Sequence, residues 1–349
     1  MLATDQSSLS VDLAPNHPQG LRLRSPVMIA SGTFGWDGYG LGFGEGPGVP
    51  GLVDLSRLGA ITAKTVTMRP RAGNPEPRWY PHSWRRVPNE LARLRDEGLI
   101  DPEIVSRLAE TTLLNSIGLT NPGIEAALRE QAPVWAQWEV PIVLSIAGET
   151  VEEFGRMASM VGNTPGIKAL ELNLSCPNVD HGASYALNPD LTRETVAQVR
   201  GNTSLPVLAK LAPNVPDLVP IAVAAQEAGA DALTICNTIP AMAIDTQTRR
   251  PVLGAVTGGI SGPGLHPVSV ALVYNVAPRV DIPIIGVGGV FTADHAIEFL
   301  LAGASAVQVG SANLANFWTP LDVVDGIASY MAKHAIERVD DLQGQVVIP

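Results

Sequence analysis

Short apolar runs recur along the chain, with segments of helical spacing between most of them, and this alternation limits the possible folds more than any other feature. Most of the runs lack a period of two, which is typical of strands that are buried on both faces of a parallel sheet. Eight runs are expected to be strands, at residues 26–30, 60–64, 141–146, 169–174, 206–211, 232–236, 283–287 and 306–309.

Five of the intervening segments have the spacing of apolar residues expected for helices, at residues 151–161, 191–199, 218–228, 267–277 and 292–301. Strands that alternate with helices indicate βαβ units. Eight such units in 349 residues fit a closed (β/α)8 barrel better than an open doubly wound sheet. The sequence therefore predicts an α/β fold of the TIM-barrel type, formed as one domain over residues 1–349.

Two segments do not follow the alternation. Residues 11–24 precede the first strand, and we expect a short hairpin there that closes the bottom of the barrel. Residues 68–114 form a long insertion between the second and third strands, with loop residues at its start and helices expected at 89–97 and 101–110. Because long insertions after barrel strands lie at the catalytic face, this one is predicted to cover the active site.

Composition excludes several classes of function. The net charge of −11 and the absence of a basic stripe argue against nucleic acid and anionic membranes as partners. No apolar run is long enough to span a bilayer, and residues 1–20 lack a secretory signal. Two cysteines make no disulfide framework, and the six histidines are not spaced as metal ligands. We therefore expect a cytoplasmic protein without a bound metal.

The fourth expected strand is followed by two asparagines and a thiol, Asn173, Cys176 and Asn178. Asparagine offers donors and an acceptor while staying neutral, and cysteine can exchange a proton without a permanent charge. This combination suits a polar, neutral heterocycle that loses a proton from carbon. A turn with Asn and Pro, in which Cys is a small apolar residue, explains the same motif equally well.

Polar or small residues also follow most of the other expected strands, and in a parallel barrel these ends meet at one face. The residues concerned are Ala30, Ser31, Gly32, Lys64, Thr65, Ser145, Lys210, Asn237 and Thr238, together with Asn115 from the loop before the third strand. Each lysine could be a surface residue with a buried stem. Two lysines and four amides directed at one rim instead favour a ligand site. Cys236 lies within a strand and is expected to be a core thiol.

Glycine-rich loops follow the last two strands, at Gly288–Gly289 and Gly310–Ser311. These loops are the usual phosphate cradle of barrels that bind phosphorylated ligands, and Ser261 with Gly262 could add a third contact. The spacing is not that of a dinucleotide fingerprint, because the third glycine is missing. A mononucleotide such as FMN fits better, and a nearby lysine would stabilise its reduced ring.

Eight motifs in this order resemble the dihydroorotate dehydrogenases of the soluble, class 1 type, and the similarity covers nearly the whole chain. They lie at residues 26–35, 63–67, 71–75, 115–123, 173–178, 209–211, 237–239 and 258–263. Residues 237–245 look most like the branch that uses NAD and pairs with an electron-transfer subunit carrying FAD and an iron–sulfur cluster. We also expect a homodimeric core.

The resemblance implies oxidation of dihydroorotate to orotate in pyrimidine (UMP) biosynthesis, with FMN as cofactor. Cys176 would take the C5 proton while C6 delivers hydride to flavin N5. The substrate residues implied are Lys64, Asn115, Gly118, Leu119, Asn173, Asn178, Asn237 and Thr238. The cofactor residues implied are Ala30, Ser31, Gly32, Lys64, Thr65, Ser145, Asn173, Lys210, Ile235, Ser261, Gly262, Gly288, Gly289, Gly310 and Ser311. Cysteine at 176 argues against the quinone-linked class, which looks to use serine.

Two departures from the family pattern weaken the assignment of the electron acceptor more than the assignment of dihydroorotate oxidation. Residues 81–110 are longer than expected, and His266 stands where related sequences often carry lysine. Two other functions stay open at this point. One is the related FMN barrel of dihydropyrimidine dehydrogenases, which act on uracil or thymine, and the other is a flavin-binding barrel without catalysis. Lys64–Thr65 and residues 115–118, which would serve a carboxylate, favour dihydroorotate.

Overall fold

The computed structural model of the protein describes residues 6–34, 54–81, 112–175, 185–316 and 318–349. The two helices expected at 89–97 and 101–110 lie outside the described residues. So do Cys176 and Asn178, the second half of the motif that follows the fourth strand.

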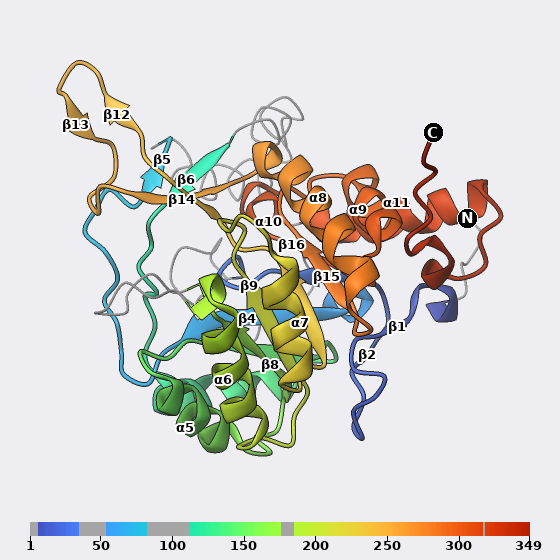
Figure 1. Ribbon diagram of the computed structural model, residues 1–349, viewed down its shortest axis with the longest axis horizontal. Helices are drawn as coiled ribbons and strands as arrows, with labels where there is room; N and C mark the ends of the chain where they lie inside the picture. Colours follow the sequence, from blue (N-terminus) through green and yellow to red (C-terminus); the bar gives the residue numbers. More distant parts are fainter. Residues whose placement is uncertain (1–5, 35–53, 82–111, 176–184, 317) are drawn as a thin grey trace.

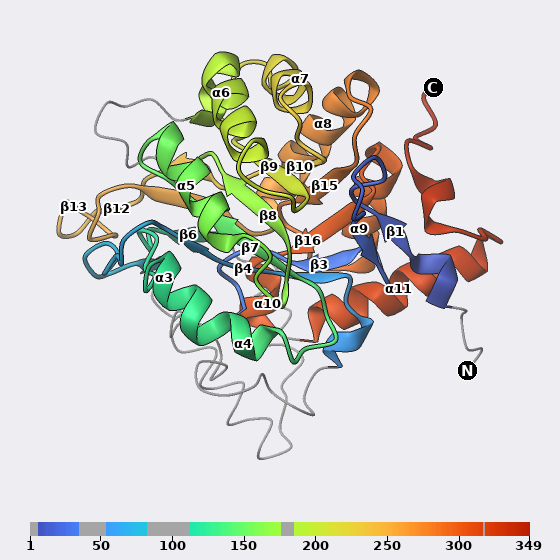
Figure 2. The same cartoon turned by 90° about the horizontal axis from the view of Figure 1, so that it is seen from below.

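Eight parallel strands close into a barrel, in the order β10-β15-β16-β3-β4-β7-β8-β9 (Figures 1 and 2). Their bounds are β3 (Val27–Ile29), β4 (Ala60–Val66), β7 (Ile142–Ile146), β8 (Ile167–Asn173), β9 (Val207–Leu211), β10 (Ala232–Ile235), β15 (Ile284–Val287) and β16 (Ala306–Val309). Nearly every residue in them is buried, since one face packs inside the barrel and the other against helices. All eight predicted strands are present, and the predicted TIM-barrel fold is confirmed.

Helices surround the barrel, as the view in Figure 2 shows. The five predicted helices are confirmed to within a few residues as α5 (Val151–Val161), α6 (Pro189–Arg200), α7 (Val219–Glu227), α8 (His266–Val276) and α9 (Ala293–Ala302). The sequence interpretation missed α10 (Ser311–Ala315), α11 (Thr319–Lys333) and the helical segment α3 (Ile124–Ala126), η4 (Ala127–Gln131) and α4 (Ala132–Trp135). Of the helices in the described ranges, none combines the length and the apolar character needed to cross a bilayer.

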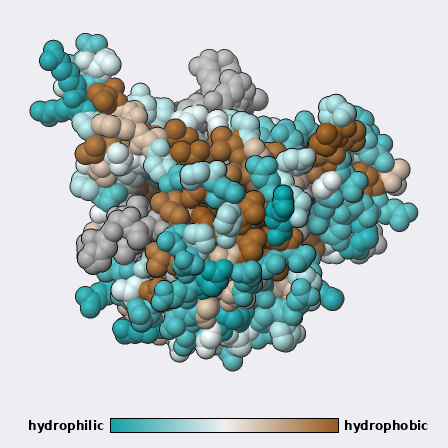
Figure 3. All heavy atoms as spheres, in the orientation of Figure 1, coloured by the Kyte–Doolittle hydropathy of each residue, from teal (hydrophilic) through white to brown (hydrophobic). Residues whose placement is uncertain are grey.

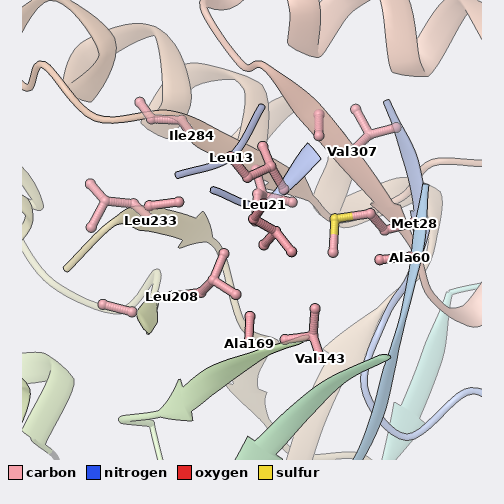
Figure 4. Packing of buried hydrophobic residues seen from close by; sticks show 14 of the residues in the cluster. Leu13, Leu21, Met28, Ala60, Val143, Ala169, Leu208, Leu233, Ile284 and Val307 are labelled. Carbon is pink, nitrogen blue, oxygen red and sulfur yellow. The ribbon is translucent and has the colours of Figure 1, made fainter. Parts of the chain in front are cut away.

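The N-terminal hairpin closes one end of the barrel, as predicted. It consists of β1 (Val11–Asp12) and β2 (Arg22–Leu23), which pair antiparallel. Leu13 and Leu21 are 0% and 4% exposed, and Figure 4 shows them between side chains of strands from around the barrel. Four buried alanines stand at corresponding positions of alternate strands, Ala60, Ala169, Ala232 and Ala306. Small side chains at these positions leave room for the two leucines.

A second, antiparallel sheet was not predicted. Its order is β11 (Ile239–Ala241), β14 (Gly258–Ser261), β6 (Leu113–Asn115) and β5 (Trp79–Tyr80). These strands are too short to show a hydrophobic period. The sheet joins the insertion after β4 to the segment after β10, so it brings two distant parts of the chain together beside the barrel.

A short hairpin, β12 (Ile244–Asp245) with β13 (Arg250–Pro251), projects away from the barrel at the left of Figure 1. Figure 3 shows hydrophilic residues on this projection, whereas apolar residues gather over the middle of the same face, in the area of α8. Val268 and Tyr274 of α8 are 40% and 46% exposed.

The buried position of Leu13 in the hairpin can be tested by its effect on stability. Replacing Leu13 with Ala should lower the free energy of unfolding by about 2–5 kcal/mol, because a fully buried leucine leaves a cavity. Urea unfolding of the purified variant measures this change. The control is Val347→Ala, since Val347 is 91% exposed and should leave stability unchanged. Equal stability of the two variants would show that the hairpin does not belong to the core.

Candidate active site

The carboxyl ends of four barrel strands are joined by hydrogen bonds that centre on Thr65. Its Oγ1 lies 2.9 Å from Ser145 Oγ and 3.3 Å from Ser31 Oγ. It also accepts a hydrogen bond from Asn173 Nδ2 at 3.3 Å. The ends of β3, β4, β7 and β8 therefore present one continuous polar surface, made of residues that the sequence had assigned to a ligand site.

The amide side chains continue this surface to β10. Asn173 Oδ1 accepts from Asn237 Nδ2 at 3.2 Å, and Asn237 Oδ1 accepts from the backbone N–H of Thr238 at 2.8 Å. Each amide thus has a fixed orientation, because both its nitrogen and its oxygen already make a hydrogen bond within the protein. The predicted convergence of Asn173, Asn237 and Thr238 is present in the structure.

Lys64 is not the last residue of its strand, as the sequence had suggested, because β4 continues to Val66. The pairing of β4 with β7 shifts register between Ala63 and Val66. A bulge of this kind re-aims side chains, and here both Lys64 and Thr65 reach the site although they are neighbours in sequence. Lys64 is 7% exposed, and a Cβ placed on Gly32 would lie 3.1 Å from its Nζ.

Lys210 is also buried, with 7% exposure, and is not a surface lysine. Its Nζ lies 3.6 Å from Oε1 of Glu171, which is fully buried inside the barrel. The sequence interpretation missed Glu171. The signal that could have found it is its position, two residues before Asn173 on the same strand, since residues at this spacing share one strand face.

The small antiparallel sheet places Asn115 beside Thr238. Asn115 Nδ2 donates to the carbonyl oxygen of Gly259 at 3.4 Å. Gly259 in turn lies against Thr238, because a Cβ at Gly259 would be 2.1 Å from Thr238 Oγ1. Only glycine fits between the two polar side chains. Asn115 thus reaches the rim through the second sheet rather than through a barrel strand.

The loop that carries Gly118 and Leu119 is held by Asn121, which the sequence had not singled out. Leu119 has a φ of +55°, a conformation that non-glycine residues rarely adopt. Asn121 Nδ2 donates to the Leu119 carbonyl at 2.7 Å and to Thr67 Oγ1 at 2.8 Å. Its Oδ1 accepts from the backbone N–H groups of Thr67 and Gly123. The loop is therefore fixed to the segment that follows β4.

The predicted phosphate loops approach each other closely. Gly289 has a φ of +65°, and a Cβ there would lie 2.8 Å from the carbonyl oxygen of Gly262 and 2.7 Å from the Cβ of His266. His266 Nδ1 lies 3.0 Å from the Gly288 carbonyl, and its Nε2 lies 3.2 Å from Glu298 Oε2. His266 therefore connects the loop after β15 to Glu298 of α9.

The other predicted residues take less central places. A Cβ on Gly310 would lie 3.6 Å from the Cβ of Ala30, so the loop after β16 adjoins the end of β3. Ser311 is buried at the start of α10. Ile235 is fully buried next to Thr234, so the alternation of side chains directs the two to opposite faces of β10.

The thiol of Cys236 is 2% exposed and lies 3.3 Å from Ser269 Oγ on α8. Burial raises its pKa to about 11, although the hydrogen bond with Ser269 and the charge of Lys210 oppose the shift. A thiol with this pKa stays protonated at neutral pH and is a poor base or nucleophile. The expectation of a core thiol is confirmed.

Comparison with known proteins then decides the family. A model of the family described as dihydroorotate dehydrogenase matches residues 92–331. The chain belongs to the dihydroorotate dehydrogenase family. The catalytic subunit of dihydroorotate dehydrogenase B (NAD(+)) from Desulforudis audaxviator is 44% identical over 328 residues, 93% of this chain and 94% of that protein. The subunit of the same name from Geotalea daltonii is 40% identical over 343 residues, 97% and 98% of the two chains.

A solved structure supports the fold alone. The crystal structure of dihydroorotate dehydrogenase from Eimeria tenella in complex with ferulenol has a TM-score of 0.71 and 21% sequence identity, and the match covers 99% of this chain and 90% of that chain. The resemblance to class 1 dihydroorotate dehydrogenases is confirmed, and the chain is an oxidoreductase of this family. A dihydropyrimidine dehydrogenase and a non-catalytic barrel are not favoured.

The environment of Cys236 gives the second prediction. In a Cys176→Ser variant, Cys236 is the one remaining cysteine. Native protein should react with a thiol reagent at pH 8 only very slowly, because about one in a thousand thiols is ionised and the sulfur is buried. Unfolding in denaturant should make the reaction complete within minutes. Rapid labelling of the native variant would contradict the buried position.

Proposed function

We propose that this dihydroorotate dehydrogenase oxidises dihydroorotate to orotate with FMN as its cofactor, in the biosynthesis of UMP. The observation that carries the proposal is the hydrogen-bonded rim of Ser31, Thr65, Ser145, Asn173 and Asn237. These neutral donors and acceptors converge at the carboxyl ends of the strands, which is the catalytic face of such barrels. Two buried lysines, Lys64 on β4 and Lys210 on β9, belong to the same group of strands.

The chain has residues that fit FMN. The contact between the Gly289 and Gly262 loops leaves no room for a side chain, which suits close approach of backbone to a phosphate. Gly288, Gly289, Gly310 and Ser311, with Ser261 and Gly262, would hold this phosphate. Ala30, Ser31, Gly32, Thr65, Ser145 and the backbone near Ile235 would line the ring. FMN, when bound, accepts a hydride from the substrate.

The substrate has a carboxylate and a ring with amide edges, and these groups fit the polar residues of the rim. Lys64 would balance the carboxylate charge, with Asn115 and the backbone of Gly118 and Leu119 closing around it. Asn173, Asn178, Asn237 and Thr238 would bind the ring edges. The hydrogen bonds that fix Asn173 and Asn237 use one N–H and one oxygen lone pair of each amide and leave the second of each for the ligand.

We assign Cys176 as the general base that takes the proton from C5 of dihydroorotate. It lies three residues after Asn173, which ends β8 inside the rim. The contrast with Cys236 supports this choice, since the second cysteine is buried and hydrogen-bonded away from the rim. A base in this place needs a thiolate, and therefore a lower pKa than that of Cys236.

The relatives are named catalytic subunits of an NAD(+)-dependent enzyme, and we propose the same organisation here. An electron-transfer subunit carrying FAD and an iron–sulfur cluster would pass electrons to NAD. The catalytic chains would form a homodimeric core in the cytoplasm. Residues 68–114 would cover the site as an insertion within a single domain of residues 1–349.

Anaerobic reduction tests the proposed function. The purified protein should be yellow, and dihydroorotate should bleach the flavin absorbance while orotate forms. Dihydrouracil and dihydrothymine should leave the flavin oxidised, because neither has the carboxylate that Lys64 and Asn115 are proposed to bind. Reduction by these compounds and not by dihydroorotate would instead indicate a dihydropyrimidine dehydrogenase. A colourless protein that does not take up FMN would refute the flavin assignment.

Replacing Cys176 with Ala should slow flavin reduction by dihydroorotate by about 10²–10⁴-fold while FMN stays bound, because general-base catalysis contributes this much. Stopped-flow absorbance under anaerobic conditions measures the rate. Cys236→Ala is the matched control, since it also removes one thiol and should reduce at the parent rate. A parent-like rate for Cys176→Ala would exclude it as the base.

A further inference from the structure

Four polar side chains form a layer inside the barrel. They are Thr62 on β4, Glu171 on β8, Thr234 on β10 and Gln308 on β16, and each is 0% exposed. These are alternate strands of the ring. A barrel layer is made of four side chains from alternate strands, and these are usually branched aliphatic residues. A carboxylate, an amide and two hydroxyls in such a layer indicate a specific role.

The layer lies directly below the candidate site. Side chains alternate along a strand, so a residue two positions further on lies one level nearer the carboxyl end. Two positions beyond three of these residues stand Lys64, Asn173 and Gly310, all of which were assigned to the site. The polar layer is therefore the floor beneath the proposed flavin and substrate positions.

The layer fixes one oxygen of Glu171 and directs the other at Lys210. Glu171 Oε2 accepts from Gln308 Nε2 at 2.9 Å and from Thr234 Oγ1 at 3.2 Å. Gln308 Nε2 also donates to Thr62 Oγ1 at 3.1 Å. Within the described part of the chain, Glu171 Oε1 has no hydrogen-bond partner, and it faces the Lys210 ammonium at 3.6 Å.

The pairing has a clear electrostatic basis. A buried carboxylate is strongly unfavourable unless an opposite charge and hydrogen bonds compensate it. Lys210 supplies that charge from the adjacent strand β9, one level nearer the site than Glu171. The charges of the two side chains cancel overall. The ammonium of Lys210 lies nearer the rim, and the carboxylate of Glu171 lies in the polar layer below it.

We propose that Glu171 is a positioning residue for Lys210, and that its carboxylate holds the ammonium at the barrel mouth and offsets its charge. This inference rests on the proposed function, which puts FMN at the rim, and on Lys210 as one of the cofactor residues that the family resemblance implies, so that its ammonium would lie beside the bound flavin. A reduced flavin carries additional negative charge, so the net charge beside the ring sets the preference for the reduced form. Glu171 thereby keeps the midpoint potential of the flavin lower than it would be if no carboxylate offset the charge of Lys210.

The test is Glu171→Gln, which keeps the side-chain size and removes the charge. The preference of the site for reduced over oxidised flavin should rise about tenfold, which is about 30 mV for a two-electron couple. Anaerobic redox titration of the purified flavoprotein measures this midpoint potential. Glu171→Asp retains the charge and should stay near the parent value. An unchanged or lowered potential for Glu171→Gln overturns the proposal.

Thr234→Val is the matched control. It removes a hydrogen bond to the same carboxylate without changing any charge, and its fully buried side chain keeps nearly the same shape. The potential should equal that of the parent protein. A shift as large as that of Glu171→Gln would mean that disturbed packing, rather than lost charge, moves the potential, and the proposal would fail.

A second comparison applies if Glu171→Gln does not accumulate as folded protein. The double variant Glu171→Gln/Lys210→Met has neither buried charge, whereas Lys210→Met alone leaves the carboxylate uncompensated. The double variant should therefore retain more flavin than Lys210→Met alone, and equal or lower flavin retention refutes the pairing.

A parent protein that binds no flavin refutes both proposals. If dihydroorotate reduces the flavin of the parent protein but the potential is the same in Glu171→Gln, only the proposal about Glu171 is refuted.

Discussion

Closure of the parallel barrel is the constraint on which the rest of the structure depends. Each of the eight strands pairs with two neighbours, so no strand can shift without breaking ladders on both sides. This ring fixes the level of every inward-facing side chain. The alanines, the polar layer around Glu171 and the rim around Thr65 are successive levels of that ring.

The side chains inside the barrel change from apolar at the closed end to polar at the open end. At the closed end, Leu13 and Leu21 of the hairpin fill the space beside small side chains and exclude water. At the open end, polar groups are bound to one another before any ligand arrives. Orienting these groups in advance reduces the reorganisation needed on binding, which is the main way in which such sites favour a reaction.

The second sheet gives the barrel an additional source of site residues. Asn115 belongs to the insertion after β4, yet its neighbour Gly259 and the adjacent Thr238 follow β10. Asn115, Thr238 and Gly259 all belong to the motifs that resemble dihydroorotate dehydrogenases. Three short antiparallel pairings explain why residues so far apart in the chain lie at one rim.

The sequence by itself determined the eight strands, five of the helices, the hairpin and the family, because buried parallel strands and local motifs leave a signal within a few adjacent residues. It also placed Asn173, Asn237 and Thr65 at one face, since strand ends meet in any parallel barrel. Only the tertiary structure decided that β4 bulges at Lys64, that Asn121 binds Thr67, and that Glu171 faces Lys210. These facts depend on strand register and on contacts between residues far apart in the chain, which a local pattern does not encode.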